Sequence, residues 1–377
     1  MSFSFIHTAD WQIGRAFAGF PADVAAALRE ARISAIDRIA EAAVRAGARH
    51  VLVAGDVFDA ETLAPKTVAQ AIARMARHGQ ITWHLLPGNH DAHRAGGLWE
   101  RLLRDGLPRH IHPVLTSQPI EIDKETWLLP APLTGRATGS DPTLSMDAAA
   151  TPPGAIRIGL AHGSVRGFGS AQTASVHLSP TRAASAGLDY LALGDWHGCQ
   201  EAAPKTWYSG TPEPDRFADN EPGFVLAIDV QGAGAAPSIT RVSTAQFAWV
   251  RAGISGVSDP SLWGANGAAA PHNRPQHDTL LQLTVTGRVT PGQRQNILTE
   301  LKRLEACHRH VDAELSQLML ISTTGGLEQL DGMGDLKPIA ERLLTIAADP
   351  TAPTAATATQ ALALLLDLAA ETRGVTP

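Results

Sequence analysis

The stretch His50–Asp59, HVLVAGDVFD, decides the fold of this chain. Residues 51–54 are apolar, as in a buried strand, and Asp56 and Asp59 follow directly. In open α/β sheets, ligands bind just beyond the carboxyl ends of the strands. We therefore predict an α/β fold with a polar site at the edge of the sheet where Asp56 lies.

Four further segments show the same arrangement, in which polar side chains follow an apolar strand. They are FSFIHTADWQIG with Asp10, ITWHLLPGNHD with Asn89, His90 and Asp91, IRIGLAHGS with His162, and YLALGDWHG with Asp195 and His197. Strands that end at one edge bring such side chains together around one pocket. Carboxylate, amide and imidazole groups are ligands that divalent cations accept. The sequence therefore predicts a metal centre.

Phosphoryl chemistry is typically assisted by two cations roughly 3.5–4 Å apart that share a carboxylate. Asp56 is the predicted bridge, because it follows a buried strand and precedes a turn. Asp10 would bind the first metal, and Asn89 and His162 the second. His90 is better placed as an acid that protonates or stabilises the leaving oxygen.

The length of 377 residues exceeds a single core, so we expect more than one domain. Strand and helix patterns alternate through the first two-thirds of the chain, and a linker rich in alanine and proline is expected at 265–275. The expected domains are an α/β domain at 1–250 that carries the predicted site, a small α+β domain at 276–325 and a helical segment at 334–377. In the last two, a strand is expected at 313–321 and a final helix near 360–372.

Composition excludes several classes of protein. A hydrophobic content of 44% and a charged content of 18% are typical of a folded globular protein. A net charge of −6 disfavours a lone nucleic-acid binder, which needs lysine and arginine for phosphate contacts. No apolar run approaches the ~18 residues of a membrane span. We expect no secretion signal, and the two distant cysteines fit a reducing cytoplasm.

The ordered motifs resemble those of the calcineurin-like metallophosphoesterases. HTADWQIG and the later SGTPEPDRFADNEPGFVLAIDV are similar to the SbcD and YhaO branch of DNA repair exonucleases. The resemblance implies a four-layer α/β/β/α core with a small α+β capping domain, and two metal ions, usually manganese. It also implies C-terminal helices that dock on the coiled coil of an SbcC-like ATPase, and a homodimer.

The resemblance also assigns roles to single residues. It places metal ligands at Asp10, Asp56, Asn89, His162 and His197, and the catalytic histidine at His90. Asp59 and Asp91 occupy acidic positions of the motifs, where we expect them to orient their neighbours.

Two positions depart from the family pattern. Gln12 and Asp195 stand where the motifs have histidine. Asp195 can bind a metal as a hard carboxylate, whereas the amide oxygen of Gln12 is a weak, neutral ligand or a hydrogen-bonding group beside the metal. The added oxygen donors favour manganese or magnesium over zinc or iron.

Three hypotheses for the function follow. The first is a DNA nuclease of SbcD type that hydrolyses phosphodiesters with a metal-activated hydroxide and acts with an SbcC-like ATPase. The second is a phosphodiesterase for small molecules such as cyclic nucleotides, against which the C-terminal segments argue. The third is a non-catalytic scaffold, against which the presence of His90, Asn89, His162 and His197 argues. The strandedness of the substrate and the polarity of cleavage stay open.

Overall fold

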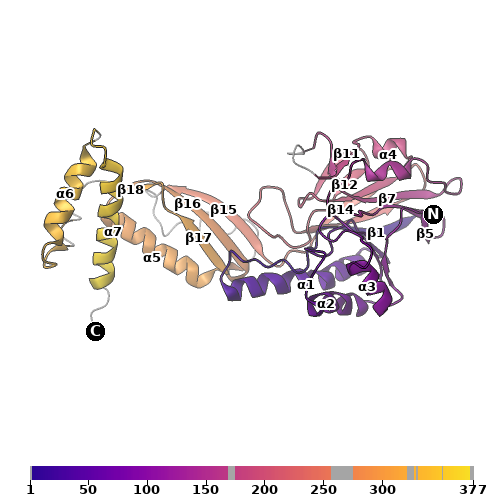
Figure 1. Cartoon of the computed structure of the whole chain (residues 1–377), viewed down its shortest axis with the longest axis horizontal. Coiled ribbons are helices and arrows are strands. Elements are labelled where there is room, and N and C mark those ends of the chain that lie inside the picture. Colours follow the sequence, from indigo (N-terminus) through magenta and orange to yellow (C-terminus); the bar gives the residue numbers. More distant parts are fainter. Residues whose placement is uncertain are drawn as a thin grey trace. The chain divides into compact units, whose positions relative to one another are not determined.

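The computed structural model describes residues 2–168, 175–255, 275–320, 327, 330–349 and 351–373. The chain divides into two compact units, Met1–Phe247 and Ala248–Pro377 (Figure 1). The second unit contains both segments expected to follow the phosphoesterase domain, 276–325 and 334–377. Residues 265–274 of the expected linker at 265–275 lie outside the described residues.

The first unit contains two six-stranded sheets. The first sheet has the order β14 (Ser238–Ser243), β13 (Phe224–Val230), β1 (Phe3–Thr8), β2 (His50–Val53), β3 (Thr82–Leu85) and β4 (Ile111–Pro113). Strands β1 to β4 are parallel, whereas β13 pairs antiparallel with β1. The antiparallel pairing carries a late segment of the chain back beside the first strand.

The second sheet has the order β11 (Gln200–Ala203), β12 (Thr206–Tyr208), β10 (Tyr190–Gly194), β7 (Ile156–His162), β6 (Thr126–Ala131) and β5 (Ile120–Asp123). Strands β12, β10, β7 and β6 are parallel, and the two edge strands pair antiparallel. The short strands β8 (Ser164–Val165) and β9 (His177–Leu178) pair beside it.

The sheets and helices of the first unit form four layers. Helices α1 (Ala22–Arg45), α2 (Pro65–Ala76) and α3 (Leu98–Asp105) lie along the outer face of the first sheet (Figure 1). The two sheets pack face to face over a shared apolar core. The short helices α4 (Arg182–Ser185) and η1 (Pro142–Met146) cover the outer face of the second sheet. The predicted α/β fold class is confirmed, with the layers in the order α/β/β/α.

Apolar side chains on both faces explain why the central strands are buried. In β2, Val51 and Val53 point to the helices, while Leu52 points to the second sheet. A parallel strand covered on both faces needs such a continuous apolar run. Polar groups are therefore excluded from the strands and collect where the strands end.

Histidines of the first sheet are an exception to this apolar packing, and one of them is the buried His7 of β1. His50, His84 and His112 lie on adjacent strands and face the second sheet, with their rings stacked in sequence. His50 Nδ1 lies 3.1 Å from His84 Nε2, so one ring donates a hydrogen bond to the other. Burial, together with the two neighbouring imidazoles, lowers the pKa of His84 to about 3. The folded unit therefore holds His84 neutral.

We expect this histidine to make the first unit sensitive to acid. Because the folded pKa of His84 lies below its unfolded value of 6.5, its contribution is complete above pH 6.5 and is lost as the pH falls towards 3. Replacing His84 with leucine should reduce the loss of unfolding free energy between about pH 7.5 and about pH 5 by about 2 kcal/mol. Urea denaturation followed by fluorescence measures this. A His110→Leu variant is the matched control, and equal acid sensitivity of the His84→Leu variant and wild type would contradict the argument.

The second unit has a small sheet covered by a helix. Strands β15 (Ala248–Ser255), β16 (Thr279–Val289) and β17 (His310–Glu314) are parallel, β18 (Leu318–Leu320) also pairs with β16, and η4 (Gln276–Asp278) precedes β16. Helix α5 (Pro291–Cys307) begins with a capping box formed by Thr290 and Gln293. Its Ile297, Leu301 and Leu304 pack on the sheet.

The last two helices of the second unit lie side by side (Figure 1). They are α6 (Leu336–Ala348) and α7 (Ala355–Arg373). Leu362, Leu366 and Ala369 of α7 are buried, whereas Leu364 and Leu368 are 63% and 60% exposed. The final helix therefore buries one apolar face and leaves leucines on another.

Two predicted elements differ from the structure. The single strand expected at 313–321 is wrong, because a turn at 315–317 separates β17 from β18. The final helix begins at Ala355, before the start near residue 360 that the sequence predicts. Alanines supply the helix propensity there, and buried Ala358 packs the added turn. None of the helices in the described part of the chain combines the length and the apolar character needed to cross a bilayer.

Candidate metal centre

The carboxyl ends of both sheets supply the predicted ligands. Asp10 and Asp56 follow β1 and β2, and each has a left-handed backbone with φ of 54°. Asp195 follows β10 with φ of 103°. Aspartate tolerates the left-handed region better than most residues, and such strained conformations concentrate at functional sites. These turns direct three carboxylates back over the strand ends.

Two glycines allow these turns to approach their neighbours. A Cβ on Gly88 would lie 2.1 Å from Asp56 Oδ1, and one on Gly55 would lie 2.3 Å from His162 Nδ1. Gly55 also has a φ of 90°. Any larger residue at either position would displace a predicted ligand. The sequence therefore keeps glycine where the ligand loops approach one another most closely.

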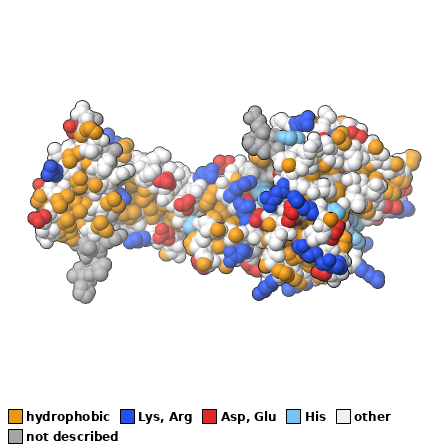
Figure 2. All heavy atoms as spheres, viewed as in Figure 1, with side chains coloured by type: hydrophobic (Ala, Val, Ile, Leu, Met, Phe, Trp, Pro, Cys, Tyr) orange, Lys and Arg blue, Asp and Glu red, His pale blue; other side chains and the backbone are white. Residues whose placement is uncertain are grey.

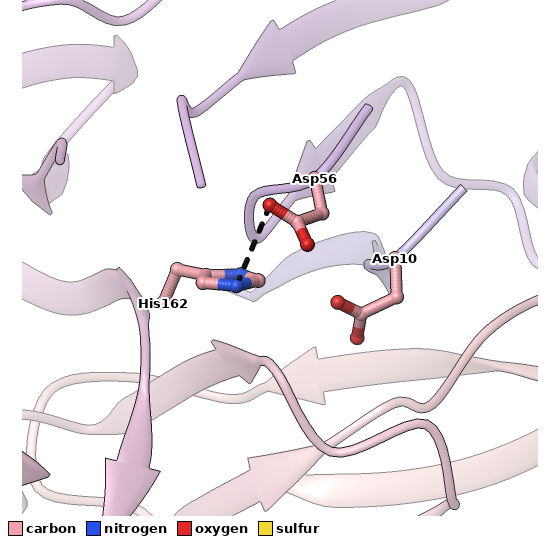
Figure 3. A group of neighbouring side chains, drawn as sticks. All are labelled: Asp10, Asp56 and His162. Carbon is pink, nitrogen blue, oxygen red and sulfur yellow. Dashed lines mark ion pairs between the residues drawn. The ribbon is translucent and has the colours of Figure 1, made fainter. Parts of the chain in front are cut away.

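The buried part of the site consists of Asp10, Asp56 and His162 (Figure 3). Their ligand atoms all lie within 4.8 Å of one another, and His162 Nε2 is 3.6 Å from Asp56 Oδ1. His162 Nδ1 lies 2.8 Å from the carbonyl oxygen of Ala54 and donates to it. That hydrogen bond fixes the tautomer and leaves Nε2 to face the carboxylates, as in histidine ligands of metals.

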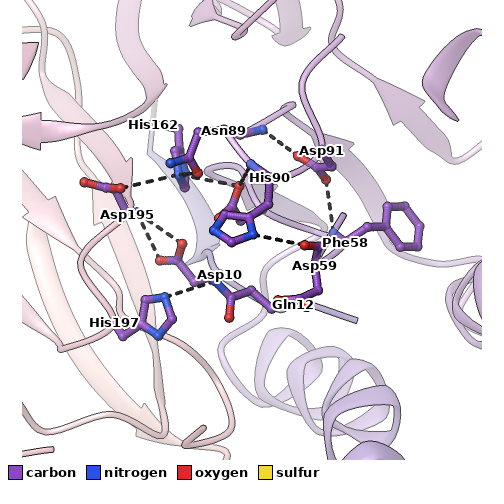
Figure 4. A network of polar contacts seen from close by, with 12 residues as sticks. Asp10, Gln12, Phe58, Asp59, Asn89, His90, Asp91, His162, Asp195 and His197 are labelled. Atoms are coloured by element: carbon purple, nitrogen blue, oxygen red, sulfur yellow. Dashed lines mark hydrogen bonds and ion pairs between the residues drawn. The ribbon is translucent and has the colours of Figure 1, made fainter. Parts of the chain in front are cut away.

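Asn89 and Asp195 extend this group on the side of His162 (Figure 4). Asn89 Oδ1 is 3.2 Å and Asp195 Oδ1 is 3.9 Å from His162 Nε2. The hydroxyl of Ser164 donates to Asp195 Oδ2 at 2.7 Å and so orients that carboxylate. Three carboxylates, one amide oxygen and one imidazole are a donor set that fits a divalent cation such as manganese.

The electrostatics of the site also fit a cation. Burial raises the pKa of Asp10 to about 6, against the lowering effect of His197 and His162. Burial alone would lower the pKa of His162, but Asp56, Asp10 and Asp195 outweigh it and raise the pKa to about 9. The histidine thus takes up a proton because buried negative charge surrounds it. A divalent cation at the same place would compensate that charge and displace the proton.

His90 lies at the open side of the site (Figure 4). Its backbone N–H donates to Asp56 Oδ1 at 3.0 Å, and its ring Nδ1 donates to the carbonyl oxygen of Asp59 at 3.0 Å. The side chain is 42% exposed, and its Nε2 is 4.0 Å from Asp56 Oδ2. The ring is therefore held from behind and presents Nε2 to the space that a bound phosphate would occupy.

Asp59 and Asp91 lie beside the ligand atoms. Both oxygens of Asp91 accept backbone N–H bonds, from Gly88 at 2.7 Å and Phe58 at 3.0 Å. Burial and the charge of Asp56 raise the pKa of Asp91 to about 8, while these two amides lower it. Asp91 thus ties together the loops after β2 and β3, and Asp59 orients the ring of His90 through its carbonyl oxygen.

Gln12 and His197 lie on the side of Asp10 opposite His162 (Figure 4). Gln12 Nε2 is 3.2 Å from His197 Nε2, and Gln12 Oε1 accepts a hydrogen bond from Arg15 at 3.0 Å. His197 Nδ1 lies 3.2 Å from Asp215 Oδ1. Burial raises the pKa of Asp215, but the hydrogen bond and the charge of His197, with nearby arginines, outweigh it and hold the pKa below its usual range. The structure brings both predicted residues to the site, already bonded to protein groups.

Sequence reasoning missed three charged residues around the site. Arg15 lies 3.3 Å from Asp215 Oδ2 and 3.8 Å from Asp59 Oδ1. Arg32 is buried, and its guanidinium donates to the carbonyl oxygens of Asp10 and Trp11. Arg15 directly follows the motif FSFIHTADWQIG, and Asp215 lies within SGTPEPDRFADNEPGFVLAIDV. Their charges, so close to predicted site residues, could have indicated a role at the site. Arg32 lies in a helix and had no such signal.

The part of the chain that contains Asp10, Asp56 and His162 matches a known protein family. Residues 3–175 match the calcineurin-like phosphoesterase family. The crystal structure of TT1561 of Thermus thermophilus is similar at 11% sequence identity and a TM-score of 0.42, covering 65% of this chain and all of that one. No curated protein matches the chain. The family match supports a metal-dependent phosphoesterase domain in the first unit.

Proposed function

We propose that this chain, with its calcineurin-like phosphoesterase domain over residues 3–175, is a metal-dependent DNA nuclease of the SbcD type. The observation that carries the proposal is the buried group of Asp10, Asp56 and His162, with His90 exposed beside it. A divalent cation bound there would polarise a phosphate and lower the pKa of water. Manganese is the proposed metal, because carboxylate and amide oxygens dominate the donor set.

Each residue then has a defined task. Asp10, Asp56, Asn89, His162 and Asp195 bind the cation. His90 Nδ1 donates to Asp59, so Nε2 is the nitrogen that faces the substrate, and the ring in its imidazolium form would give the Nε2 proton to the leaving oxygen. The half-exposed His90 also sets where the phosphate lies, on the open side of the buried carboxylates. Cation binding and proton transfer are thus tasks of different residues.

The segment that resembles the SbcD branch supports DNA as the substrate. Within it, Asp215 contacts the site through His197, and Phe224–Val230 forms β13, which pairs with β1. The segment that resembles the SbcD branch therefore contributes a residue that contacts the site. A small-molecule phosphodiesterase is the alternative that the assay below separates.

We extend the proposal to a partner. Exposed Leu364 and Leu368 on α7, with Ile339 on α6, give the second unit an apolar surface, and Figure 2 shows hydrophobic side chains over these helices. Such a surface suits a coiled coil of an SbcC-like ATPase. A homodimer of this chain and a cytoplasmic location belong to the same proposal. The free thiols of Cys199 and Cys307 fit a reducing compartment.

The test is cleavage of labelled DNA and of bis(p-nitrophenyl) phosphate, each with manganese, magnesium or a chelator. We expect manganese to support cleavage of both, and the chelator to abolish it. Hydrolysis of the ester without cutting of DNA, even with an SbcC-like ATPase added, would favour the small-molecule phosphodiesterase. Inactivity on both substrates in every metal would favour the scaffold.

A further inference from the structure

We infer that this centre binds one divalent cation tightly, at the second metal position beside Asn89, His162 and Asp195. Arg15 blocks the first metal position, beside Asp10 and His197, by holding the Gln12 amide. The inference rests on the proposed function, because it concerns the same metal centre. It departs from the two cations that the resemblance implies. Its evidence is the hydrogen bonding of Gln12, whose amide nitrogen contacts His197 and whose amide oxygen accepts from Arg15.

The hydrogen bonds of His197 define which group Gln12 presents to it. Arg15 pairs with Asp215 Oδ2 at 3.3 Å, so this carboxylate serves as an acceptor, and His197 Nδ1 donates to its Oδ1 at 3.2 Å. In the neutral imidazole, Nε2 then carries the lone pair. The amide nitrogen of Gln12, 3.2 Å away, donates to it. The lone pair that would bind a first cation is therefore occupied by an N–H group.

The hydrogen bond from Arg15 fixes the same orientation of the amide from its other end. Arg15 donates to Gln12 Oε1 at 3.0 Å. Turning the amide over would put its N–H groups against the guanidinium and its oxygen against the lone pair of His197. Gln12 is only 3% exposed, so water has little access to replace the lost bonds. In the orientation that keeps the hydrogen bonds of Gln12 with both Arg15 and His197, the oxygen of Gln12 does not point to the first metal position.

Arg15 is itself held in place by its surroundings. Its guanidinium pairs with Asp215 at 3.3 Å and Asp59 at 3.8 Å, and it lies over the ring of Phe17 at 5.8 Å. A cation bound to Gln12 Oε1 would approach a fixed positive charge that already donates to that oxygen. Charge repulsion thus adds to the loss of the ligand atom.

The other side of the centre has no such obstacle among the described residues. Asn89 Oδ1 and the carboxylates of Asp56 and Asp195 surround His162 Nε2 within 3.9 Å. No arginine or lysine pairs with Asp56 or Asp195 in the described part of the chain. On this side, no arginine or lysine among the described residues competes with a cation for the carboxylates.

The experiment measures manganese binding by the full chain. Metal-free protein is dialysed to equilibrium against Mn²⁺, the metal per chain is counted, and the EPR spectrum of frozen solution is recorded. We expect one manganese per wild-type chain, with the hyperfine pattern of an isolated ion. Gln12→His should bind two and show exchange coupling, because the ring supplies a ligand nitrogen and offers Arg15 no oxygen. Arg15→Met should tighten the second equivalent by about ten- to hundredfold, as removal of a neighbouring bond typically alters metal affinity.

Three further variants locate the bound ion and control for general effects. Asp195→Ala should lose the single manganese, whereas Gln12→Leu should retain it. Arg94→Met is the matched control, since Arg94 is an exposed arginine near the site that pairs with Glu61 at 3.1 Å, and it should bind as wild type does. Circular dichroism checks that each variant is folded.

The outcomes separate this inference from the proposed function. Two tightly bound, coupled manganese ions in wild type would overturn the inference and leave the proposed function intact. A single ion that is lost in Gln12→Leu but kept in Asp195→Ala would also overturn it, as would failure of both Gln12→His and Arg15→Met to strengthen the second equivalent. A wild-type chain that binds no manganese would overturn the proposed metal centre itself.

Discussion

Replacing Asp56 with asparagine should lower kcat/KM for phosphodiester hydrolysis by about a thousandfold. The Asp56 carboxylate lies in the buried group with Asp10 and His162, and it also accepts the backbone N–H of His90 at 3.0 Å. Removing its charge weakens cation binding, and a bound cation contributes several kcal/mol to the transition state, where each 1.4 kcal/mol is about tenfold in rate. Steady-state kinetics with manganese at saturating and limiting concentrations measure the loss.

Asparagine is chosen because it keeps the turn. It tolerates the left-handed φ of 54° that Asp56 adopts, and its amide oxygen can still accept from His90. A matched control is Asp37→Asn, which removes a carboxylate of α1 that pairs with Arg74 of α2 and with His78 just after that helix. That variant should retain activity. If Asp56→Asn stayed within a few fold of wild type, Asp56 would not be a ligand on which the chemistry depends.

Replacing His90 with alanine should lower kcat by roughly a hundred- to ten-thousandfold and leave manganese binding unchanged. The ring is 42% exposed, and its Nδ1 is bonded to Asp59, so Nε2 is the one nitrogen that can serve a substrate. General acid catalysis matters most for a poor leaving group. The loss should therefore be large for DNA and smaller for an ester that releases nitrophenolate.

Comparing the two substrates in the His90→Ala variant tests this assignment directly. Equal losses on both esters would indicate that the histidine binds the phosphate without transferring a proton. Loss of manganese together with activity would instead make His90 a ligand. His93→Ala is the matched control, because His93 lies on the same loop and pairs with Glu100 at 3.6 Å. We expect it to behave as wild type.

Much of the first unit could be predicted because an apolar run in the sequence indicates a strand, and the polar residue at its end indicates a ligand. Each of Asp10, Asp56 and His162 stands at the end of an apolar run or directly after it, and parallel strands carry those ends to one edge. The edge strands left no such signal. Strand β11, for example, is the largely polar QEAA, and it is a strand because β12 pairs with it.

The hydrogen bonding of Gln12 could not be predicted for a different reason. It depends on Arg15, His197 and Asp215, and Asp215 lies about two hundred residues along the chain from Gln12. Antiparallel pairing of β13 with β1 carries that segment back to the site. A local pattern shows which residues follow a strand, but it does not show which of them bond to one another in the folded chain.

The left-handed turns at Asp10 and Asp56 also bear on how such a centre can change in evolution. Their φ of 54° suits aspartate, asparagine and glycine, and few other residues. A single exchange of aspartate for asparagine would remove the charge that holds the cation while the turn, the strands and the packing between the sheets persist. Such a domain can therefore lose its catalytic activity while it keeps its fold. A protein of closely similar structure can be expected to share the activity only if it also has aspartate at both positions.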